Sequence, residues 1–367
     1  MSNWKLAALV LTGSVMTSGT VPAQQTVPVS EIDALVRRAF ALNSTPGLGV
    51  AVVQNGRMIY RAALGFADAT ARNAATDSTL WYIASTSKSF TGFGIALLEA
   101  AGTVDVNAPI NTLLPRARWH ADVRPQELNL AAFLSHTHGL GNGPIVMSAA
   151  FTGAFEESRY GELLQYYPPG NRALQYGNLG YNVASMVIDA KRAEGWKRYL
   201  ESAVYAPAGL RQTFARLSGL APGRIARPHE LQSDGTFRTA VFAKTDATMN
   251  AAGGHMATID DLARWITVHM DSGRIDGRQV FPARAVQRAH EMLAPQNLQF
   301  AFFQRDGWGM GWDIGSYHGE RMISRFGSHA STRSHISFLP ARRIGVVAQV
   351  KWRNRFGAHR HHCRVRV

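Results

Sequence analysis

The N-terminal part of the chain changes from a helical to a strand-like pattern of apolar residues. Between residues 30 and 40 apolar side chains recur every three or four positions, which predicts a helix. Two strand-like runs, 48–53 and 58–63, follow it. They are joined by Asn55 and Gly56, the dipeptide that most strongly favours a tight hairpin. The pattern predicts a helix and then a β-hairpin at the edge of a sheet.

The remaining elements follow from the same kind of pattern. A short apolar run at 81–84 leads into a predicted helix over 90–101, which Gly102 ends. From 103 to 250 the chain has the pattern of helices and loops, with frequent Gly and Pro. A helix at 259–270 comes next. Strand patterns then return at 309–314, 322–326, 334–339 and 344–350.

A sheet that starts near one end of the chain and finishes near the other, with helices between, predicts an α/β (α+β) fold. We expect residues 24–102 and 251–350 to form one discontinuous α/β domain, and residues 103–250 to form an inserted, mostly α-helical domain. A cleft between the two domains would then hold a functional site.

The first 23 residues have the pattern of a secretory signal peptide. Lys5 precedes an apolar run over 6–15, and small residues at 21–23 precede an expected cut before Gln24. The run is too short for the roughly 20 residues of a membrane-spanning helix, although a short membrane anchor is the alternative. No later segment is apolar enough to span a bilayer. The pattern predicts a periplasmic or secreted protein whose mature form has no membrane span.

The net charge of +14 does not point to nucleic acid. Residues 351–367 carry six of the basic residues and no carboxylate, and the remaining charge is scattered among acidic residues. We predict an atypical, solvated basic tail there, no nucleic-acid partner, and no metal or cofactor. The single cysteine, Cys363, excludes an intrachain disulfide.

Ser85 and Lys88 are the first candidate catalytic pair. Residues three apart on a helix lie on the same face, so the amine of Lys88 can reach the hydroxyl of Ser85. A serine needs a neighbouring base to become a nucleophile, and a lysine serves as that base when its surroundings lower its pKa. The alternative is an ordinary solvated helix face.

Two further motifs add candidate groups. Tyr176 and Asn178 stand two residues apart in a loop, where a phenol can relay a proton and an amide can orient a substrate or the lysine. On a late strand, Arg325 supplies a cation for a substrate carboxylate and Gly327 allows a close approach to the backbone. The N–H of Ser328 can donate to an oxyanion.

Together these motifs resemble those of the serine β-lactamase and penicillin-binding protein superfamily, and specifically its class C β-lactamase branch with related esterases and peptidases. The resemblance covers about residues 30–350. It implies an antiparallel sheet flanked by helices, attack by Ser85 on a carbonyl, and proton transfers shared by Lys88 and Tyr176. It implies an oxyanion hole made by the N–H groups of Ser85 and Ser328. Further segments that resemble the family are 134–140, 252–254, 308–312 and 333–340.

The sequence departs from that family in two places. Arg325 stands where lysine or histidine is usual, so it keeps the positive charge but cannot exchange a proton. The glycines that usually follow Gly327 are replaced. Residues 352–367 lack the apolar stripe of the family's closing helix, and we expect a truncated or frame-altered tail that leaves sheet surface poorly covered.

Two classes of function follow. The first is a secreted serine hydrolase that forms an acyl-enzyme and acts on a small-molecule substrate, which is a β-lactam, an ester or a small peptide-like amide. The second is a catalytically weak penicillin-binding or sensing protein with the same cleft. The sequence does not distinguish between Lys88 and Tyr176 as the general base, and the oligomeric state stays open.

Overall fold

The computed structural model describes residues 28–42, 45–240, 244–300, 302–351 and 354–355. The predicted signal peptide and most of the predicted basic tail lie outside these residues, so both stay predictions. Within the described ranges, no helix has the length and apolar content that crossing a membrane requires. Across the same ranges, His, Cys, Asp and Glu side chains do not gather in groups of three as metal ligands would.

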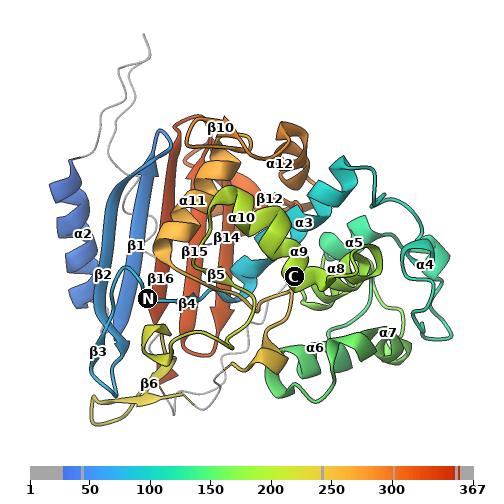
Figure 1. Ribbon diagram of the computed structural model, residues 1–367, viewed down its shortest axis with the longest axis horizontal. Helices are drawn as coiled ribbons and strands as arrows, with labels where there is room; N and C mark the ends of the chain where they lie inside the picture. Colours follow the sequence, from blue (N-terminus) through green and yellow to red (C-terminus); the bar gives the residue numbers. More distant parts are fainter. Residues whose placement is uncertain (1–27, 43–44, 241–243, 301, 352–353, 356–367) are drawn as a thin grey trace.

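A nine-stranded antiparallel sheet forms the centre of the molecule, and it joins the two ends of the chain (Figure 1). The strand order is β11-β12-β13-β14-β15-β16-β1-β2-β3, so the N-terminal strand β1 pairs with the late strand β16. The early strands are β1 (Gly47–Gln54), β2 (Arg57–Asp68) and β3 (Asn73–Ala74). The late strands are β11 (Ala294–Phe300), β12 (Phe303–Trp308), β13 (Asp313–Tyr317), β14 (Glu320–His329), β15 (Thr332–Leu339) and β16 (Ile344–Lys351). The predicted mixed fold with an antiparallel sheet is confirmed.

The β1–β2 hairpin is formed as predicted. Asn55 and Gly56 have φ angles of 52° and 76°, the left-handed pair that a tight two-residue turn requires. Because β1 is buried along its whole length, its Leu and Val residues pack on both faces of the sheet. On the outer face they meet the helix α2 (Val29–Leu42) through Ile32 and Val36.

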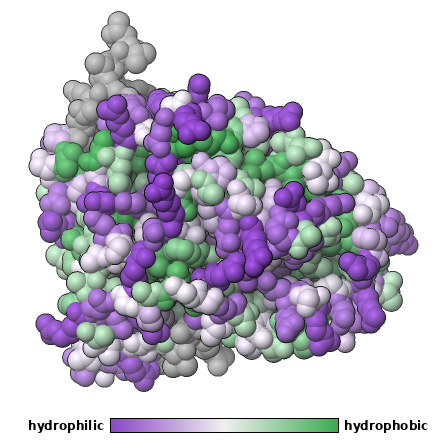
Figure 2. All heavy atoms as spheres, viewed as in Figure 1, coloured by the Kyte–Doolittle hydropathy of each residue, from purple (hydrophilic) through white to green (hydrophobic). Residues whose placement is uncertain are grey.

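On its inner face the sheet contacts the helix α11 (Ile259–Met270) through β1, β2, β15 and β16, and the helices α3 (Lys88–Ala100) and α12 (Ala283–Ala289) pack against each other. Helix α11 has the bounds that the apolar period predicts, and Figure 1 shows it lying across the sheet. Its side chains join those of α3 and the sheet in the largest apolar core, which continues into the helical region. Figure 2 shows hydrophilic and hydrophobic residues interspersed over the face that it displays.

Helices and loops make up most of residues 103–250, and Figure 1 shows α4 to α8 gathered beside the sheet. The helices are α4 (Ile110–Leu113), α5 (Leu130–Leu134), α6 (Pro144–Met147), α7 (Tyr160–Leu163), α8 (Leu179–Lys191), α9 (Gly195–Leu200) and α10 (Ala206–Ala208). Short strands make two small sheets: β4 (Trp81–Tyr82), β8 (Met256–Ala257) and β5 (Thr213–Phe214), and β17 (Asn354–Arg355), β6 (His229–Leu231) and β7 (Phe237–Thr239). A hairpin of β9 (Arg274–Ile275) and β10 (Arg278–Gln279) follows α11. The division into two domains stays a prediction.

The predicted strand over 309–314 is wrong in most of its length. Residues 309–312 form a turn ahead of β13, and Gly311 within it has a φ of 88°. A Cβ on Gly311 would lie 2.1 Å from the carbonyl oxygen of Lys88, so the turn packs directly against the start of α3. The apolar residues of this segment are buried because the turn contacts a helix. Their burial therefore does not indicate a strand, although the apolar composition suggested one.

Candidate active site

Ser85 lies on a strained turn where the chain passes from the sheet side into α3. The 3-10 turn η2 (Ala84–Ser87) precedes α3, and Ala84 has a φ of 48°, a left-handed conformation that is uncommon for a residue with a Cβ. Thr86 anchors the turn by donating to the Ser334 hydroxyl on β15 at 2.9 Å. Ser85 therefore occupies a position that the surrounding structure fixes.

Lys88 is fully buried and contacts three oxygen atoms. Its Nζ lies 2.7 Å from Asn178 Oδ1, 2.7 Å from the carbonyl oxygen of Ala252, and 3.3 Å from Ser85 Oγ. The predicted pair of Ser85 and Lys88 is thus in hydrogen-bond contact, and Asn178 holds the lysine. Lys88 Nζ donates to all three oxygens; once the amine has lost a proton, its two remaining N–H groups can serve Asn178 and Ala252, and its lone pair is then available to Ser85.

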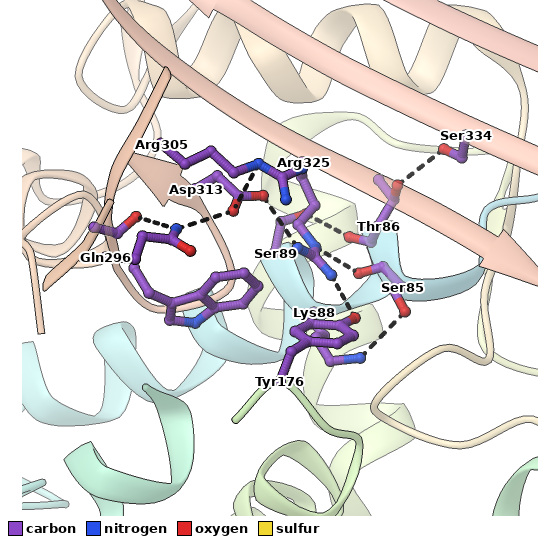
Figure 3. A network of polar contacts seen from close by, with 12 residues as sticks. Ser85, Thr86, Lys88, Ser89, Tyr176, Gln296, Arg305, Asp313, Arg325 and Ser334 are labelled. Carbon is purple, nitrogen blue, oxygen red and sulfur yellow. Dashed lines mark hydrogen bonds and ion pairs between the residues drawn. The ribbon is translucent and has the colours of Figure 1, made fainter. Parts of the chain in front are cut away.

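Tyr176 meets the same group of side chains from the helical region. Its hydroxyl accepts a hydrogen bond of 2.6 Å from Arg325 Nη2, while Arg325 Nε donates to the Ser85 carbonyl oxygen at 3.0 Å (Figure 3). One guanidinium therefore contacts both the η2 turn and the phenol. Lys88 Nζ lies 5.1 Å from the centre of the Tyr176 ring. Although Tyr176 is 48% exposed, its hydroxyl points into this cluster.

The pKa values of both candidate bases are lowered. Burial lowers the pKa of Lys88 to about 8; the charge of Tyr176 opposes this effect, and the charge of Arg325 adds a smaller lowering effect. Burial alone would raise the pKa of Tyr176. The charges of Arg325 and Lys88 outweigh that effect and lower the pKa of the phenol to about 8. Each group is therefore closer to its basic form near neutral pH than it would be in water.

Gly327 lies directly against the η2 turn. A Cβ at this position would stand 2.1 Å from the Ile83 carbonyl oxygen and 3.0 Å from the Thr86 nitrogen. The sequence suggested that this glycine makes room for a substrate, but the close neighbour in the structure is the protein's own η2 turn. Ser328 follows next on β14, and its side chain is exposed.

Arg325 differs from its predicted role as a partner for a substrate carboxylate. It is 3% exposed, and its third contact is to Asp313 Oδ2, which Nη1 reaches at 3.2 Å. Asp313 also forms an ion pair with Arg305 at 3.3 Å. Because the three nitrogen atoms of Arg325 all donate to protein atoms, its guanidinium is a fixed internal part of the site.

Several site groups were not predicted as such. Asp313 on β13 and Arg305 on β12 come together with Arg325 only in the folded sheet, where β13 lies between β12 and β14. The Ala252 carbonyl is a backbone atom without a sequence signal. His136 belongs to the 134–140 segment that resembles the family, and the centre of its ring lies 4.8 Å from that of the Tyr176 ring at a tilt of 58°. Burial, followed by the charge of Lys88, lowers the pKa of His136 well below its usual value, so it is neutral.

The antiparallel sheet with its flanking helices, and the serine and lysine in contact at the start of α3, place the protein in the class of serine β-lactamases and penicillin-binding proteins. A profile of the family described as "Beta-lactamase" matches residues 32–362. The chain belongs to the β-lactamase family.

Curated relatives are distant. Protein flp of Staphylococcus aureus (strain COL) is 20% identical over 250 residues, which cover 66% of this chain and 49% of that protein. Penicillin-binding protein 4* of Bacillus subtilis (strain 168) is 26% identical over 187 residues, covering 48% of this chain and 39% of that protein. The chain thus spans about half the length of the first of these relatives and less of the second.

Solved structures agree with the fold. The octameric penicillin-binding protein homologue from Pyrococcus abyssi superposes with a TM-score of 0.74 at 17% identity, covering 89% of this chain and 74% of that one. The D-amino acid amidase from Ochrobactrum anthropi SV3, complexed with L-phenylalanine, gives a TM-score of 0.70 at 19% identity, covering 87% and 88%. At these identities the likeness shows the fold alone.

Proposed function

We propose that this protein is a serine hydrolase that forms an acyl-enzyme on Ser85. The observation that carries the proposal is the set of contacts around Lys88. Lys88 Nζ donates short hydrogen bonds to Asn178 and to the Ala252 carbonyl and a longer one to Ser85; when the amine loses a proton, the two short bonds use both remaining N–H groups and the lone pair is left for the Ser85 hydroxyl. A lysine in this state is a general base, and burial lowers its pKa to about 8 to reach that state.

In the proposed reaction the Ser85 oxygen forms a bond to the substrate carbonyl carbon while its proton passes to Lys88. The tetrahedral intermediate then collapses, and the bond from that carbon to the leaving group breaks as the leaving group takes a proton from the Lys88–Tyr176 pair. Water attacks the resulting ester, gives a proton to the same pair, and releases the acid. The proton returned to Ser85 restores the starting state.

The N–H groups of Ser85 and Ser328 are our candidates for the oxyanion hole. The close approach of Gly327 to the η2 turn supports this proposal, because it brings the backbone after Gly327 next to Ser85. Such donors matter as much as the base, since the loss of one typically costs about 10²–10³ in rate. We propose that Asn178 acts chiefly by holding Lys88 and that Arg325 stabilises the phenolate of Tyr176.

The test uses two probes with the wild type and Ser85→Ala: a chromogenic short-chain ester and a fluorescent penicillin. We expect the wild type to turn over at least one probe and the variant to lose that activity. A wild type that is labelled by penicillin without release would support the weak penicillin-binding function instead. Equal activity of both proteins would contradict a role of Ser85 as nucleophile.

The finer assignments are also proposals. We infer a class C-like enzyme that acts on an ester, a β-lactam or a small peptide-like amide.

We also infer export to the periplasm or medium after removal of residues 1–23. Support for export comes from the apolar run at 6–15 and the small residues at 21–23. N-terminal sequencing of the protein recovered from the extracytoplasmic fraction tests export, and we expect it to start at Gln24. A protein found in the cytoplasm with an intact N-terminus would contradict it.

A further inference from the structure

Two arginines and an aspartate lie on three neighbouring strands behind the proposed catalytic groups. Asp313 on β13 accepts a hydrogen bond from Arg325 on β14 at 3.2 Å and pairs with Arg305 on β12 at 3.3 Å (Figure 3). The side chains of Asp313 and Arg325 are 1% and 4% exposed. Salt therefore screens the pair weakly, and the removal of one charge leaves the others uncompensated.

The Arg325 guanidinium is held at three points. Nε donates to the Ser85 carbonyl oxygen, Nη2 to the Tyr176 hydroxyl and Nη1 to Asp313. Because the guanidinium is planar and its donors keep fixed directions, a partner on Nη1 determines where Nη2 points. Asp313 is thus in a position to fix the contact between Arg325 and the phenol without touching a substrate itself.

Asp313 also supplies the negative charge of the cluster. Ionisable groups facing the Tyr176 phenol are Lys88 on α3, Arg325 on β14, Arg305 on β12, Asp313 on β13, Tyr181 on α8 and His136 after α5. Burial raises the pKa of Tyr181 and lowers that of His136, so both are uncharged. Two arginines and one carboxylate then set the electrostatic potential at the phenol and at Lys88.

We propose that Asp313 is a positioning residue, which holds Arg325 against Tyr176 and, in balance with Arg305, sets the pH at which the site becomes active. This inference rests on the proposed function, because it gives Tyr176 and Lys88 the proton transfers. Loss of the Asp313 charge makes the site more positive, favours phenolate and neutral amine, and moves the acid limb of the pH profile to lower pH. Loss of the Arg305 charge has the opposite sign.

The size of the effect follows from the geometry. One guanidinium separates Asp313 from the phenol oxygen, so the distance between the Asp313 carboxylate and that oxygen is roughly 6–7 Å. A unit charge at that distance shifts a titration by about one to two pH units at an effective dielectric constant of 20–40. We expect a shift of about one unit or more to lower pH for Asp313→Asn, whose side-chain oxygen still accepts from Arg325. For Arg305→Gln we expect roughly half a unit or more to higher pH.

The experiment measures kcat/KM against pH for the wild type, Asp313→Asn and Arg305→Gln with the chromogenic ester. Glu320→Gln is the matched control: it removes a carboxylate from the start of β14 that pairs with Arg342 at the surface, and we expect no shift. If Asp313→Asn does not fold, the test rests on Arg305→Gln, for which the acid limb of the pH profile should move to higher pH. Unchanged pH profiles in both site variants, with altered thermal stability alone, would reduce the cluster to a structural role and overturn the proposal.

A second readout needs no substrate. The absorbance change on phenolate formation, measured as the difference between each protein and its Tyr176→Phe counterpart, reports the titration of Tyr176 directly. We expect the midpoint to fall in Asp313→Asn and to rise in Arg305→Gln, and equal midpoints would overturn the proposal. This measurement also separates the positioning role of Asp313 from the proposed hydrolase function. The Tyr176 titration tests the role of Asp313 even if Ser85→Ala shows that the hydrolase function is wrong.

Discussion

The close contact between Gly327 and the η2 turn gives a prediction that mutagenesis can test. Gly327→Ala places a Cβ 2.1 Å from the Ile83 carbonyl oxygen and 3.0 Å from the Thr86 nitrogen, and both neighbours are backbone atoms. Ordinary packing needs a carbon–oxygen separation of about 3.5 Å, so β14 and the η2 turn must separate by roughly 1 Å. Since Ser85 lies in that turn, the change displaces the proposed nucleophile from the proposed oxyanion donors.

We expect this displacement to lower kcat/KM for the ester by about 10²-fold or more, because a misplacement of roughly 1 Å at a reacting group costs that much. The overpacked site also loses about 1–3 kcal/mol in the free energy of unfolding. Steady-state kinetics and a thermal melt at the same pH measure the two effects, and the melt shows whether the variant is folded at the assay temperature.

Gly223→Ala is the matched control for this experiment. Gly223 has an ordinary φ, and the nearest atom to a Cβ there is 4.0 Å away, so we expect unchanged activity and stability. If folded Gly327→Ala keeps wild-type kcat/KM within about threefold, the close approach of β14 to the turn does not position the reacting groups. That result would refute the proposed oxyanion site as well.

Three further predictions concern the base and the core. The wild-type kcat/KM should rise with pH as Lys88, whose pKa burial lowers to about 8, loses its proton; a flat profile between pH 6 and 9 would contradict its role. Asn178→Asp adds a negative charge 2.7 Å from the Lys88 amine, so the acid limb should move up by about one pH unit or more, and an unmoved limb argues against Lys88 as base. Gly92→Ala puts a Cβ 2.2 Å from the Met310 carbonyl oxygen, and urea unfolding should show a loss of about 1–3 kcal/mol; an unchanged midpoint would contradict the packing.

The part of the fold that the sequence predicts is the part with a clear period. Helix α11 has apolar residues at helical spacing and was found with its observed bounds, although ten of its 12 residues are buried. The β1–β2 hairpin is marked by Asn55 and Gly56 and was found at the right place, although β2 continues to Asp68, beyond the predicted end. The strands β11 and β12 were missed. Most residues of β11 are exposed or half-buried, and Pro295 lies within it, so it has neither the alternation nor the composition of a central strand.

The candidate site divides in a similar way. Ser85, Lys88 and the Tyr176–Asn178 pair were proposed because each stands in a short motif whose spacing is itself the signal, and the structure brings them into contact. Asp313 was not proposed, because its partners are 8 and 12 residues away on other strands and meet it only through sheet pairing. The same limit applies to Arg325: the sequence suggested a contact to a substrate carboxylate, whereas the folded chain brings Ser85, Tyr176 and Asp313 to its guanidinium.

The most direct test of the central claim is to trap the acyl-enzyme. The protein is incubated with the activated ester or with penicillin, quenched in acid and digested, and the peptide that contains Ser85 is analysed by mass spectrometry. We predict an added acyl mass on Ser85 in the wild type and in no peptide of Ser85→Ala. An adduct on another residue, or turnover with no acyl mass on Ser85 at any quench time, would contradict the account.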